Sequence, residues 1–488
     1  MFYKRKSNIL FRDYVSFGYI TDDRNFGYRQ LVNNENVIGD RILSQSGTVF
    51  FSVLNKEPQM IDKLVAEIKK KFPNITFEVL RRDAIKFYHE LEKDGFVIFG
   101  NTFQECESND FKFSYKTIKN ASNNTFASYS ITNKQYTQDF FNEYFAGIPQ
   151  LTSIHIEITS KCNERCVHCY IPHENKITDM PPNLFFDILN QCRNMNLLHI
   201  TISGGEPMLH KDFCEFLKKC REYDFSVRIL TNLTILEDKI IKELKTNSLL
   251  CIQTSLYAMN ADIHDKITNV QGSFENTMKG ILQLIENDIP LQISCPIMKQ
   301  NKDYYADVVL WAKKNNVEVN YDPALIGKYN STTQNLENRL TIAEVREIIE
   351  NEIKNDLNQL GQLKHDVIKK ETIAPNDKIC SVCNSSICIA ENGNVYPCIG
   401  WQSYVVGNIK EKPLKFIWEN SEKLQYLRNL RNKDFPKCIK CPEKSFCTMC
   451  MVRNANENPD GNPLVVNNYF CDMARITKEI YFSHIHLL

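Results

Sequence analysis

The fold of this chain is decided by the stretch Ile158-Thr-Ser-Lys-Cys162-Asn-Glu-Arg-Cys166-Val-His168-Cys169-Tyr170. The spacing C-x3-C-x2-C places three thiols in one short loop, directly after the alternating apolar stretch 153–158. Cysteine thiolates hold iron–sulfur clusters, and a cubane cluster has four irons. Three protein ligands leave one iron open, which makes a reactive site rather than a pure electron carrier. A zinc knuckle is the alternative, although zinc sites usually take four ligands in paired spacing.

Composition limits the possible classes of protein. The length of 488 residues predicts two to four domains, and the 43% share of hydrophobic residues is typical of a soluble protein with a sizeable core. Lys+Arg equals Asp+Glu at 59 each, so no nucleic-acid or membrane partner is expected. The N-terminus has no apolar signal core, and no stretch could span a bilayer. Eighteen cysteines without an export signal therefore predict a cytoplasmic protein with metal ligation rather than disulfides.

Residues 1–100 are expected to form a small α/β domain. The sequence predicts strands at 8–14, 17–21, 25–32 and 96–99, and helices with apolar residues at helical spacing over 58–72 and 78–94. The polar segment 101–150 is expected to be a linker or bridging segment.

Residues 151–340 alternate between strand and helix patterns. Strands are predicted at 153–158, 198–203, 226–231, 250–256, 290–297 and 316–321, each separated by an amphipathic helical stretch. This rhythm predicts a parallel sheet in a partial, six-unit TIM-like barrel with its chemistry at the carboxyl ends of the strands. A helical bridge over 341–372 then leads into a cysteine-rich region at 373–488.

A second motif follows the second strand, at Gly204-Gly205-Glu206-Pro207. Paired glycines let the backbone come close to a ligand, because no side chain intervenes. Together the two motifs resemble the radical S-adenosylmethionine (radical SAM) enzymes. The resemblance implies that Cys162, Cys166 and Cys169 hold a [4Fe-4S] cluster whose open iron chelates S-adenosylmethionine, and that the resulting adenosyl radical abstracts a hydrogen atom. It also implies that Gly204 to Pro207 hold the methionine amino group, with Asn232 and Ser255 near the carboxylate or ribose.

The C-terminal region contains a second field of cysteines, at Cys380, Cys383, Cys398, Cys438, Cys441, Cys447, Cys450 and Cys471. Asn392-Gly393 is a hairpin signal that would fold Cys398 back beside Cys383. The arrangement resembles the SPASM extension of radical SAM enzymes, with two residues instead of three before Cys450. The resemblance implies two auxiliary [4Fe-4S] clusters, one on Cys380, Cys383, Cys398 and Cys450, the other on Cys438, Cys441, Cys447 and Cys471. A double zinc ribbon is the alternative.

Other polar and sulfur-bearing residues receive no role. Cys388 falls inside an apolar strand and is expected in the core, and the remaining isolated cysteines are interpreted as ordinary thiols. The pair His264-Asp265 in a helical stretch is typical of solvated residues. No residue is assigned as a catalytic acid, base or nucleophile.

The strand–helix–helix–strand pattern of residues 1–100 is similar to the winged-helix-like element with which peptide-maturing enzymes bind a leader peptide as an added strand. A plain accessory domain is the alternative. The domain order resembles maturases of ribosomally made peptides of the sactipeptide and ranthipeptide type. It implies an enzyme that forms cysteine thioether crosslinks in a precursor peptide, with electrons from a donor such as flavodoxin or ferredoxin.

Other functions stay open at this stage. Within the enzymes, these are carbon–carbon or carbon–oxygen crosslinking of a peptide, and formylglycine formation, although sulfatase-maturing enzymes generally lack the N-terminal domain. The alternative from another class is an iron–sulfur electron carrier or peptide-binding adaptor, which would need neither an open iron nor a methionine site.

Overall fold

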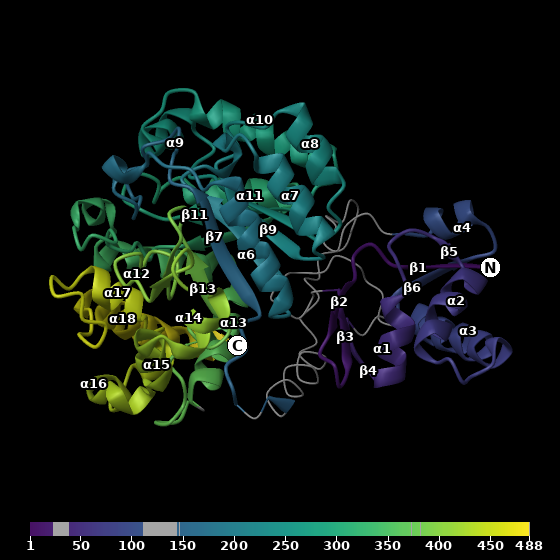
Figure 1. The fold of residues 1–488 in the computed structure, drawn as a ribbon. Helices are drawn as coiled ribbons and strands as arrows, with labels where there is room; N and C mark the ends of the chain where they lie inside the picture. Colours follow the sequence, from purple (N-terminus) through teal and green to yellow (C-terminus); the bar gives the residue numbers. More distant parts are fainter. Residues whose placement is uncertain (23–38, 111–143, 146, 372, 381, 488) are drawn as a thin grey trace.

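The computed structural model describes residues 1–22, 39–110, 144–145, 147–371, 373–380 and 382–487 (Figure 1). The predicted strand at 25–32 and most of the predicted linker 101–150 lie outside the described residues. Within this part of the chain, an N-terminal lobe stands to one side of a larger body made of the parallel sheet and the cysteine-rich C-terminal region.

The N-terminal lobe contains two small antiparallel sheets and a set of helices. The sheets have the strand orders β5-β1-β6 and β2-β3-β4. The elements are β1 (Phe2–Arg5), β2 (Leu10–Asp13), β3 (Gly18–Thr21), β4 (Asp40–Leu43), α1 (Gln45–Ser52), β5 (Gln59–Met60), α2 (Ile61–Lys71), α3 (Phe77–Lys93), β6 (Val97–Gly100) and α4 (Phe103–Ser108). The predicted helices at 58–72 and 78–94 correspond to α2 and α3. Five elements of the lobe were not predicted, namely β1, β4, α1, β5 and α4, the last of which lies in the expected linker.

The lobe has its own core, because α2 and α3 bury their apolar faces against each other and the sheets. Ile61, Leu64, Val65 and Ile68 of α2 are buried at the predicted helical spacing. The side chain of Thr76 caps α3 by accepting a hydrogen bond from the Val79 backbone N–H.

The lobe packs against the amino ends of the parallel strands in the larger body. Leu10, Phe17 and Tyr19 of the β2-β3 hairpin share a cluster with Leu198 and Leu249, which directly precede β8 and β10. A buried ionic group lies beside this cluster. Asp224, just before β9, pairs with Arg5 at 3.0 Å, with Lys56 at 2.8 Å and with Arg12 at 3.8 Å.

Six parallel strands follow in sequential order, with helices as crossover connections. Their order is β12-β11-β10-β9-β8-β7, so the predicted alternating α/β architecture of a partial barrel is confirmed. The strands are β7 (Ser153–Thr159), β8 (His199–Gly204), β9 (Ser226–Thr231), β10 (Leu250–Ser255), β11 (Leu291–Pro296) and β12 (Glu318–Asp322). The helices are α6 (Pro182–Asn194), α7 (Phe213–Glu222), α8 (Asp238–Lys245), α9 (Ala261–Thr268), α10 (Ser273–Glu286) and α11 (Tyr305–Lys314).

Strand β7 presents different residues to its two sides. Ile154, Ile156 and Ile158 are buried in the main core, which includes Phe185, Ile188 and Leu189 of α6. Because successive side chains of a strand point to opposite faces, His155 and Glu157 lie on the other face, inside the partial barrel.

The C-terminal region extends this sheet. Strand β13 (Ser386–Ile389) pairs in parallel with β7, and β14 (Asn394–Tyr396) and β15 (Gly407–Asn408) continue it as antiparallel strands. Gly393 adopts φ +91° in the tight turn between β13 and β14, as the Asn-Gly signal predicts. The other helices are α12 (Ile342–Asn355), α13 (Leu357–Glu371), α14 (Leu414–Asn420), α15 (Glu422–Asn429), α16 (Pro436–Ile439), α17 (Met451–Asn456) and α18 (Asn468–His484).

The predicted helical bridge is two helices rather than one. Its start, at α12, carries a capping box in which Thr341 and Glu344 satisfy each other's backbone N–H groups. The chain leaves the helical conformation at Asp356, whose φ of −150° separates α12 from α13.

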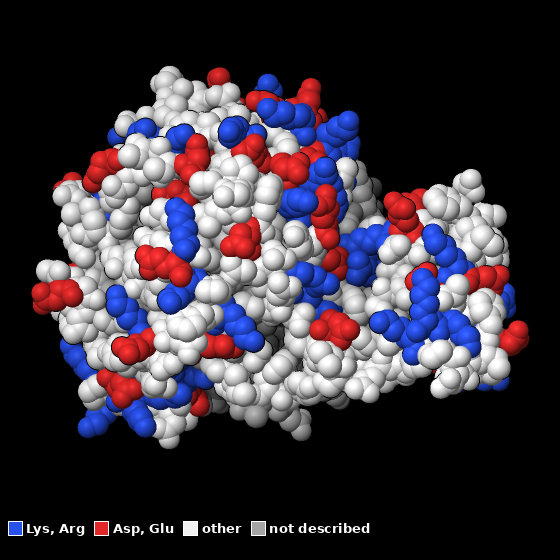
Figure 2. All heavy atoms as spheres, viewed as in Figure 1, with Lys and Arg blue, Asp and Glu red and all other residues white. Residues whose placement is uncertain are grey.

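Two surface observations bear on partners. On the face shown in Figure 2, acidic and basic side chains are interspersed over both the lobe and the larger body. No helix in the described part of the chain is long and apolar enough to cross a membrane.

Candidate active site

The three-cysteine loop lies at the carboxyl end of β7 and is joined to α9 by backbone hydrogen bonds. The backbone N–H groups of Arg165 and Val167 donate to the carbonyls of Thr268 and Ile267 at 3.0 and 2.9 Å. His168 is tied to Tyr257, since its Nε2 lies 2.9 Å from the Tyr257 hydroxyl. The loop therefore has a fixed place beside the ends of β7 and β10.

The thiols of this loop are close enough to interact electrostatically. Burial raises the pKa of Cys166 well above its ordinary value, and the charges of Glu164, Cys169 and Cys162 raise it further. Burial likewise raises the pKa of Cys162 to about 11. A bound metal cluster would supply the positive charge that such thiolates need.

The donor set fits a cubane better than a single metal ion. Among the described residues, no three His, Cys, Asp or Glu side chains converge as they would around one ion. A cubane instead takes each thiolate on a different iron. Cys162, Cys166 and Cys169 would therefore hold three of its irons.

The glycine motif packs directly against the cysteine loop. Gly205 N–H donates to the Thr159 carbonyl at 2.9 Å, and Glu206 N–H donates to the Lys161 carbonyl at 2.8 Å. A Cβ on Gly204 would lie 1.9 Å from the Thr159 carbonyl oxygen, and one on Gly205 would lie 2.2 Å from that of Lys161. The paired glycines thus allow β8 to approach the backbone that leads into the cysteine loop.

Glu206 joins the carboxyl ends of two neighbouring strands. It is fully buried, and its carboxyl accepts hydrogen bonds from the Met208 N–H, the Thr231 hydroxyl and the Asn232 N–H at 2.9, 2.7 and 2.7 Å. Burial raises the pKa of Glu206 to about 7. Pro207 begins the short 3-10 turn Pro207–Leu209 that follows.

The two remaining residues predicted near S-adenosylmethionine also lie at strand ends. The Asn232 side-chain amide donates to Asn163 inside the cysteine loop at 2.9 Å. Ser255 ends β10 and pairs in register with Ser294 of β11. The structure therefore brings the ends of β7, β8, β9 and β10 together around one loop.

The C-terminal cysteines fall into the two groups that the resemblance implies. The ionised thiol of Cys398 would interact with those of Cys450 and Cys380, and the thiol of Cys383 with those of Cys380 and Cys398. In the other group, Cys447 interacts with Cys471, Cys438 and Cys441. A cavity of about 370 Å³ lies beside this second group, between Cys438, Cys441 and Cys471.

Cys388 is buried, as predicted for a core residue, but it lies near the first of these groups. Its pKa is raised well above the ordinary value by burial, then by Cys398, Glu157 and Cys383. Cys388 also pairs in register with His155 of β7, so it lies beside that strand.

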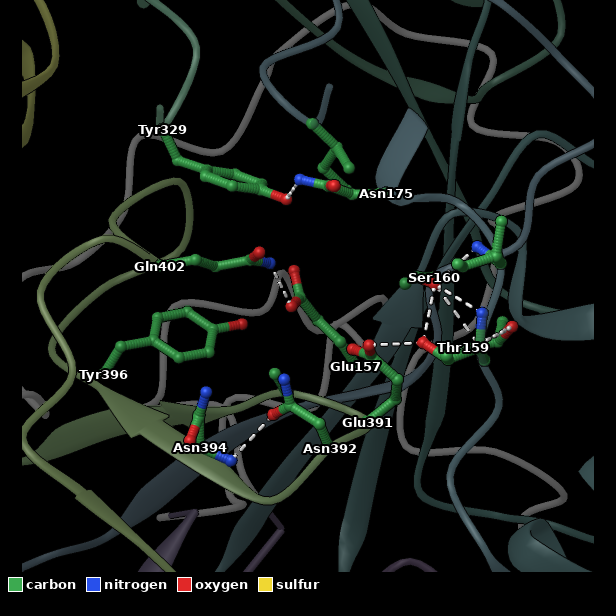
Figure 3. Close-up of a pocket in the computed structure, with 15 residues that line it drawn as sticks. Glu157, Thr159, Ser160, Asn175, Tyr329, Glu391, Asn392, Asn394, Tyr396 and Gln402 are labelled. Atoms are coloured by element: carbon green, nitrogen blue, oxygen red, sulfur yellow. Dashed lines mark hydrogen bonds between the residues drawn. The ribbon is translucent and has the colours of Figure 1, made fainter. Parts of the chain in front are cut away.

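A second cavity, of about 350 Å³, lies where the inner face of β7 meets the β13-β14 hairpin (Figure 3). Glu157, Tyr396 and Gln402 line it, and Gly204 brings the end of β8 to its wall. Gln402 donates a hydrogen bond to Glu157. Sequence reasoning missed these residues, although a glutamate in a strand with apolar neighbours was a detectable signal.

Comparison with known proteins identifies the domains. Residues 156–312 match the radical SAM superfamily, and residues 380–442 match SPASM, an iron–sulfur cluster-binding domain. The chain is a radical SAM enzyme that carries a SPASM domain. It binds S-adenosylmethionine and iron–sulfur clusters. Because it belongs to a class of enzymes, it is not a non-catalytic electron carrier or adaptor.

Curated relatives of this radical SAM enzyme are moderately similar in sequence. AdoMet-dependent heme synthase of Methanosarcina barkeri is 26% identical over 325 residues, which are 61% of this chain and 90% of that protein. GTP 3',8-cyclase of Helicobacter pylori is 26% identical over 263 residues, 52% of this chain and 81% of the relative.

Solved structures share the fold over different lengths. Streptococcus suis SuiB bound to its precursor peptide SuiA has a TM-score of 0.58 at 16% identity, covering 96% of this chain and 99% of that one. The enzyme anSMEcpe with bound AdoMet has a TM-score of 0.55 at 19% identity, covering 69% of this chain and 94% of that one.

Proposed function

We propose that this enzyme modifies a ribosomally made precursor peptide after translation and forms cysteine thioether crosslinks in it. One observation carries the proposal, namely that a separate N-terminal lobe of strands and helices precedes the radical SAM and SPASM domains. The likeness to SuiB, solved with a precursor peptide, extends over 96% of the chain and so includes this lobe. The likeness to anSMEcpe, also solved with a peptide, covers 69%.

The lobe offers a place for a leader peptide. Strand β4 stands at the end of the order β2-β3-β4, and α3 belongs to the same lobe. A leader bound as an added strand would gain main-chain hydrogen bonds from such a terminal strand. The lobe would then hold the substrate while the site around the cysteine loop carries out the chemistry.

The site residues have separate tasks in this proposal. Cys162, Cys166 and Cys169 would hold the first cluster, and Gly204 to Pro207, Asn232 and Ser255 would position S-adenosylmethionine. With both bound, the cofactor supplies hydrogen-atom abstraction from a carbon of the peptide. The protein's part is to fix that carbon close to the cofactor and exclude water.

The eight C-terminal cysteines would hold two further clusters. Forming a carbon–sulfur bond from a thiol and a C–H group removes two hydrogen atoms in all, so one electron must leave after hydrogen abstraction. The auxiliary clusters would accept that electron, and an external donor such as flavodoxin or ferredoxin would resupply the first cluster. Cys388 is close enough to Cys398, Cys383 and Glu157 to interact with them electrostatically.

The test is co-expression with a short, cysteine-bearing precursor encoded beside the gene, followed by mass spectrometry. Each thioether should lower the peptide mass by two hydrogen atoms, and its cysteine should no longer react with alkylating reagents. Replacing that cysteine by alanine should prevent the ring. A mass loss that persists without cysteine would instead identify a carbon–carbon or carbon–oxygen crosslink, and loss of the cysteine or serine side-chain function would identify formylglycine formation.

A further inference from the structure

In the described part of the chain, no basic side chain pairs with Glu157, the acid in the cavity between β7 and the β13-β14 hairpin. The Glu157 side chain is 2% exposed, and its Oε2 accepts the hydrogen bond from Gln402. Its Oε1 is buried, and no described residue gives it a hydrogen bond of standard geometry. Leaving a buried carboxyl oxygen without a partner costs free energy that a bound ligand can recover.

Tyr396 presents a second polar group in the same cavity, close to the Glu157 carboxyl. Its hydroxyl is buried and points towards Glu157 (Figure 3), but no hydrogen bond of standard geometry joins the two. The hydroxyl is near enough to influence the pKa of Glu157. Both groups therefore face the space that a ligand would fill.

The cavity wall is acidic. Glu391 is the second carboxyl, and it is held in place because its Oε1 accepts a hydrogen bond from the Thr178 hydroxyl at 2.6 Å. No Lys, Arg or His is among the described residues that line the cavity. Burial, with a smaller contribution from the charge of Glu391, raises the pKa of Glu157 to about 7. A positively charged group in the cavity would stabilise both carboxylates.

The cavity also stands at the correct place for a substrate. It reaches the end of β8 at Gly204 and the end of β7 at Thr159 and Ser160, which lead into the cysteine loop. Its other wall is the β13-β14 hairpin of the SPASM region. Asn232 and Ser255, on the far side of the site, do not line it.

We propose that this cavity binds a positively charged side chain, lysine or arginine, of the substrate peptide, and that the Glu157 carboxylate pairs with it. The inference rests on the proposed function in one respect, that the ligand is part of a peptide. Glu157 is then a specificity-determining residue that brings a neighbouring carbon of the peptide to the reaction centre.

The experiment measures binding of short capped peptides to the full-length, anaerobically reconstituted enzyme at saturating S-adenosylmethionine. Two matched pairs are compared, lysine against norleucine and arginine against citrulline. A charge-assisted hydrogen bond in a buried site predicts at least a tenfold preference for a charged member over its neutral match. The pair with the larger ratio identifies which cation the cavity takes.

Two variants assign the preference to Glu157. The Glu157→Gln enzyme should lose most of the charge preference while keeping its iron content and its cleavage of S-adenosylmethionine. Glu352→Gln is the matched control. Glu352 lies on α12 beside Tyr305, and burial raises the pKa of Glu352 to about 7, as it does for Glu157. Glu352 does not line the cavity. That variant should retain the full preference.

Three outcomes would overturn the proposal. The first is equal binding of charged and neutral peptides to the wild-type enzyme, a comparison that needs no variant. The second is a charge preference that survives in Glu157→Gln. The third is peptide binding that occurs without S-adenosylmethionine and disappears at saturating S-adenosylmethionine, which would assign the cavity to the cofactor. Because these peptides carry no leader and are scored by binding, failure here is distinguishable from failure to mature a precursor.

Discussion

Burial stabilises the protonated form of the thiols in the cysteine loop. The pKa of Cys162 is raised to about 11 by burial, so the free side chain stays protonated at neutral pH. Cluster binding must remove that proton, since the thiolate is the ligand. Cluster binding must therefore offset the free-energy cost of deprotonating these buried thiols.

Replacing the three cysteines of the loop should remove one cluster and leave the two auxiliary clusters in place. Three cubanes would give about 12 irons per chain, and replacing Cys162, Cys166 and Cys169 together by alanine should leave about 8. Cleavage of S-adenosylmethionine should disappear, and iron and sulfide analysis with quantification of deoxyadenosine would measure both effects.

The control for this variant is Cys214→Ala, which removes a partly buried thiol of α7 that lies in none of the three groups. It should keep full iron content and activity. Stoichiometric zinc with little iron in the wild-type protein would contradict the cluster assignment.

At the scale of elements, the carboxyl ends of β7 and β8 approach so closely that no side chain fits between their backbones. The ends of β7 and β8 touch through Gly204 and Gly205, where any side chain would meet the carbonyls of Thr159 and Lys161. The cysteine loop therefore depends on β8 for its position, and the two motifs act as one unit.

Gly205→Ala tests this dependence. Its Cβ would lie 2.2 Å from the Lys161 carbonyl oxygen, so β8 must move away from the loop. We expect loss of S-adenosylmethionine cleavage, measured as deoxyadenosine formed, with the N-terminal lobe unaffected. Gly361→Ala in α13 is the control, because nothing lies within 4 Å of its added Cβ and alanine favours a helix. Equal activity of the two variants would show that the contact has no role.

Most of these elements could be predicted, because their signals are local. The six parallel strands were expected from apolar runs, and each agrees with the structure to within one or two residues at either end. The pairing of β13 with β7 was not predicted, since Ser386 and Ser153 are far apart in the chain and no sequence period links them. For the same reason the cavity at Glu157 was missed.

One interpretation of the sequence was wrong. The sequence pattern predicts that His264 and Asp265 are solvated, but both are buried. Asp265 accepts hydrogen bonds from the N–H groups of Gly272 and Phe274, and so fixes the start of α10. Adjacent polar residues in a helix look the same in sequence whether they face water or cap a neighbouring helix.

At the scale of the whole molecule, one carboxylate joins the lobe to the barrel. Burial alone would raise the pKa of Asp224, but Arg5, Lys56 and Arg12 hold it well below its ordinary value. Removing one partner from such a buried ionic group leaves the other charges uncompensated.

Asp224→Asn should therefore loosen the lobe and destabilise the protein by about 3 to 5 kcal/mol. Because the pKa is lower in the folded state, the contribution of Asp224 is present above the unfolded value of about 3.9 and is lost as pH falls below it. The difference in free energy of unfolding between the wild type and the variant should thus become smaller in acid. Thermal unfolding against pH would measure it, with limited proteolysis reporting on the lobe, and a constant gap down to low pH would contradict the assignment.

The position of the lobe sets a minimum distance between a peptide segment bound to the lobe and the cysteine loop. Leu198, Leu249 and Asp224 place it at the amino ends of the strands, whereas the cysteine loop follows the carboxyl end of β7. The 7 residues of β7 separate the two ends by about 23 Å. An extended chain needs at least about seven residues to cover that span.

A precursor held by the lobe can therefore be altered only beyond that interval from its anchored segment. Deleting residues from the interval should abolish modification abruptly once fewer than about seven remain, whereas inserting glycine and serine should be tolerated. Mass spectrometry of a graded series of precursors would reveal the threshold, and a gradual decline without one would show that the peptide takes another route. The barrel wall would then act as a molecular ruler, making the first residues after the anchor inaccessible whatever their chemistry.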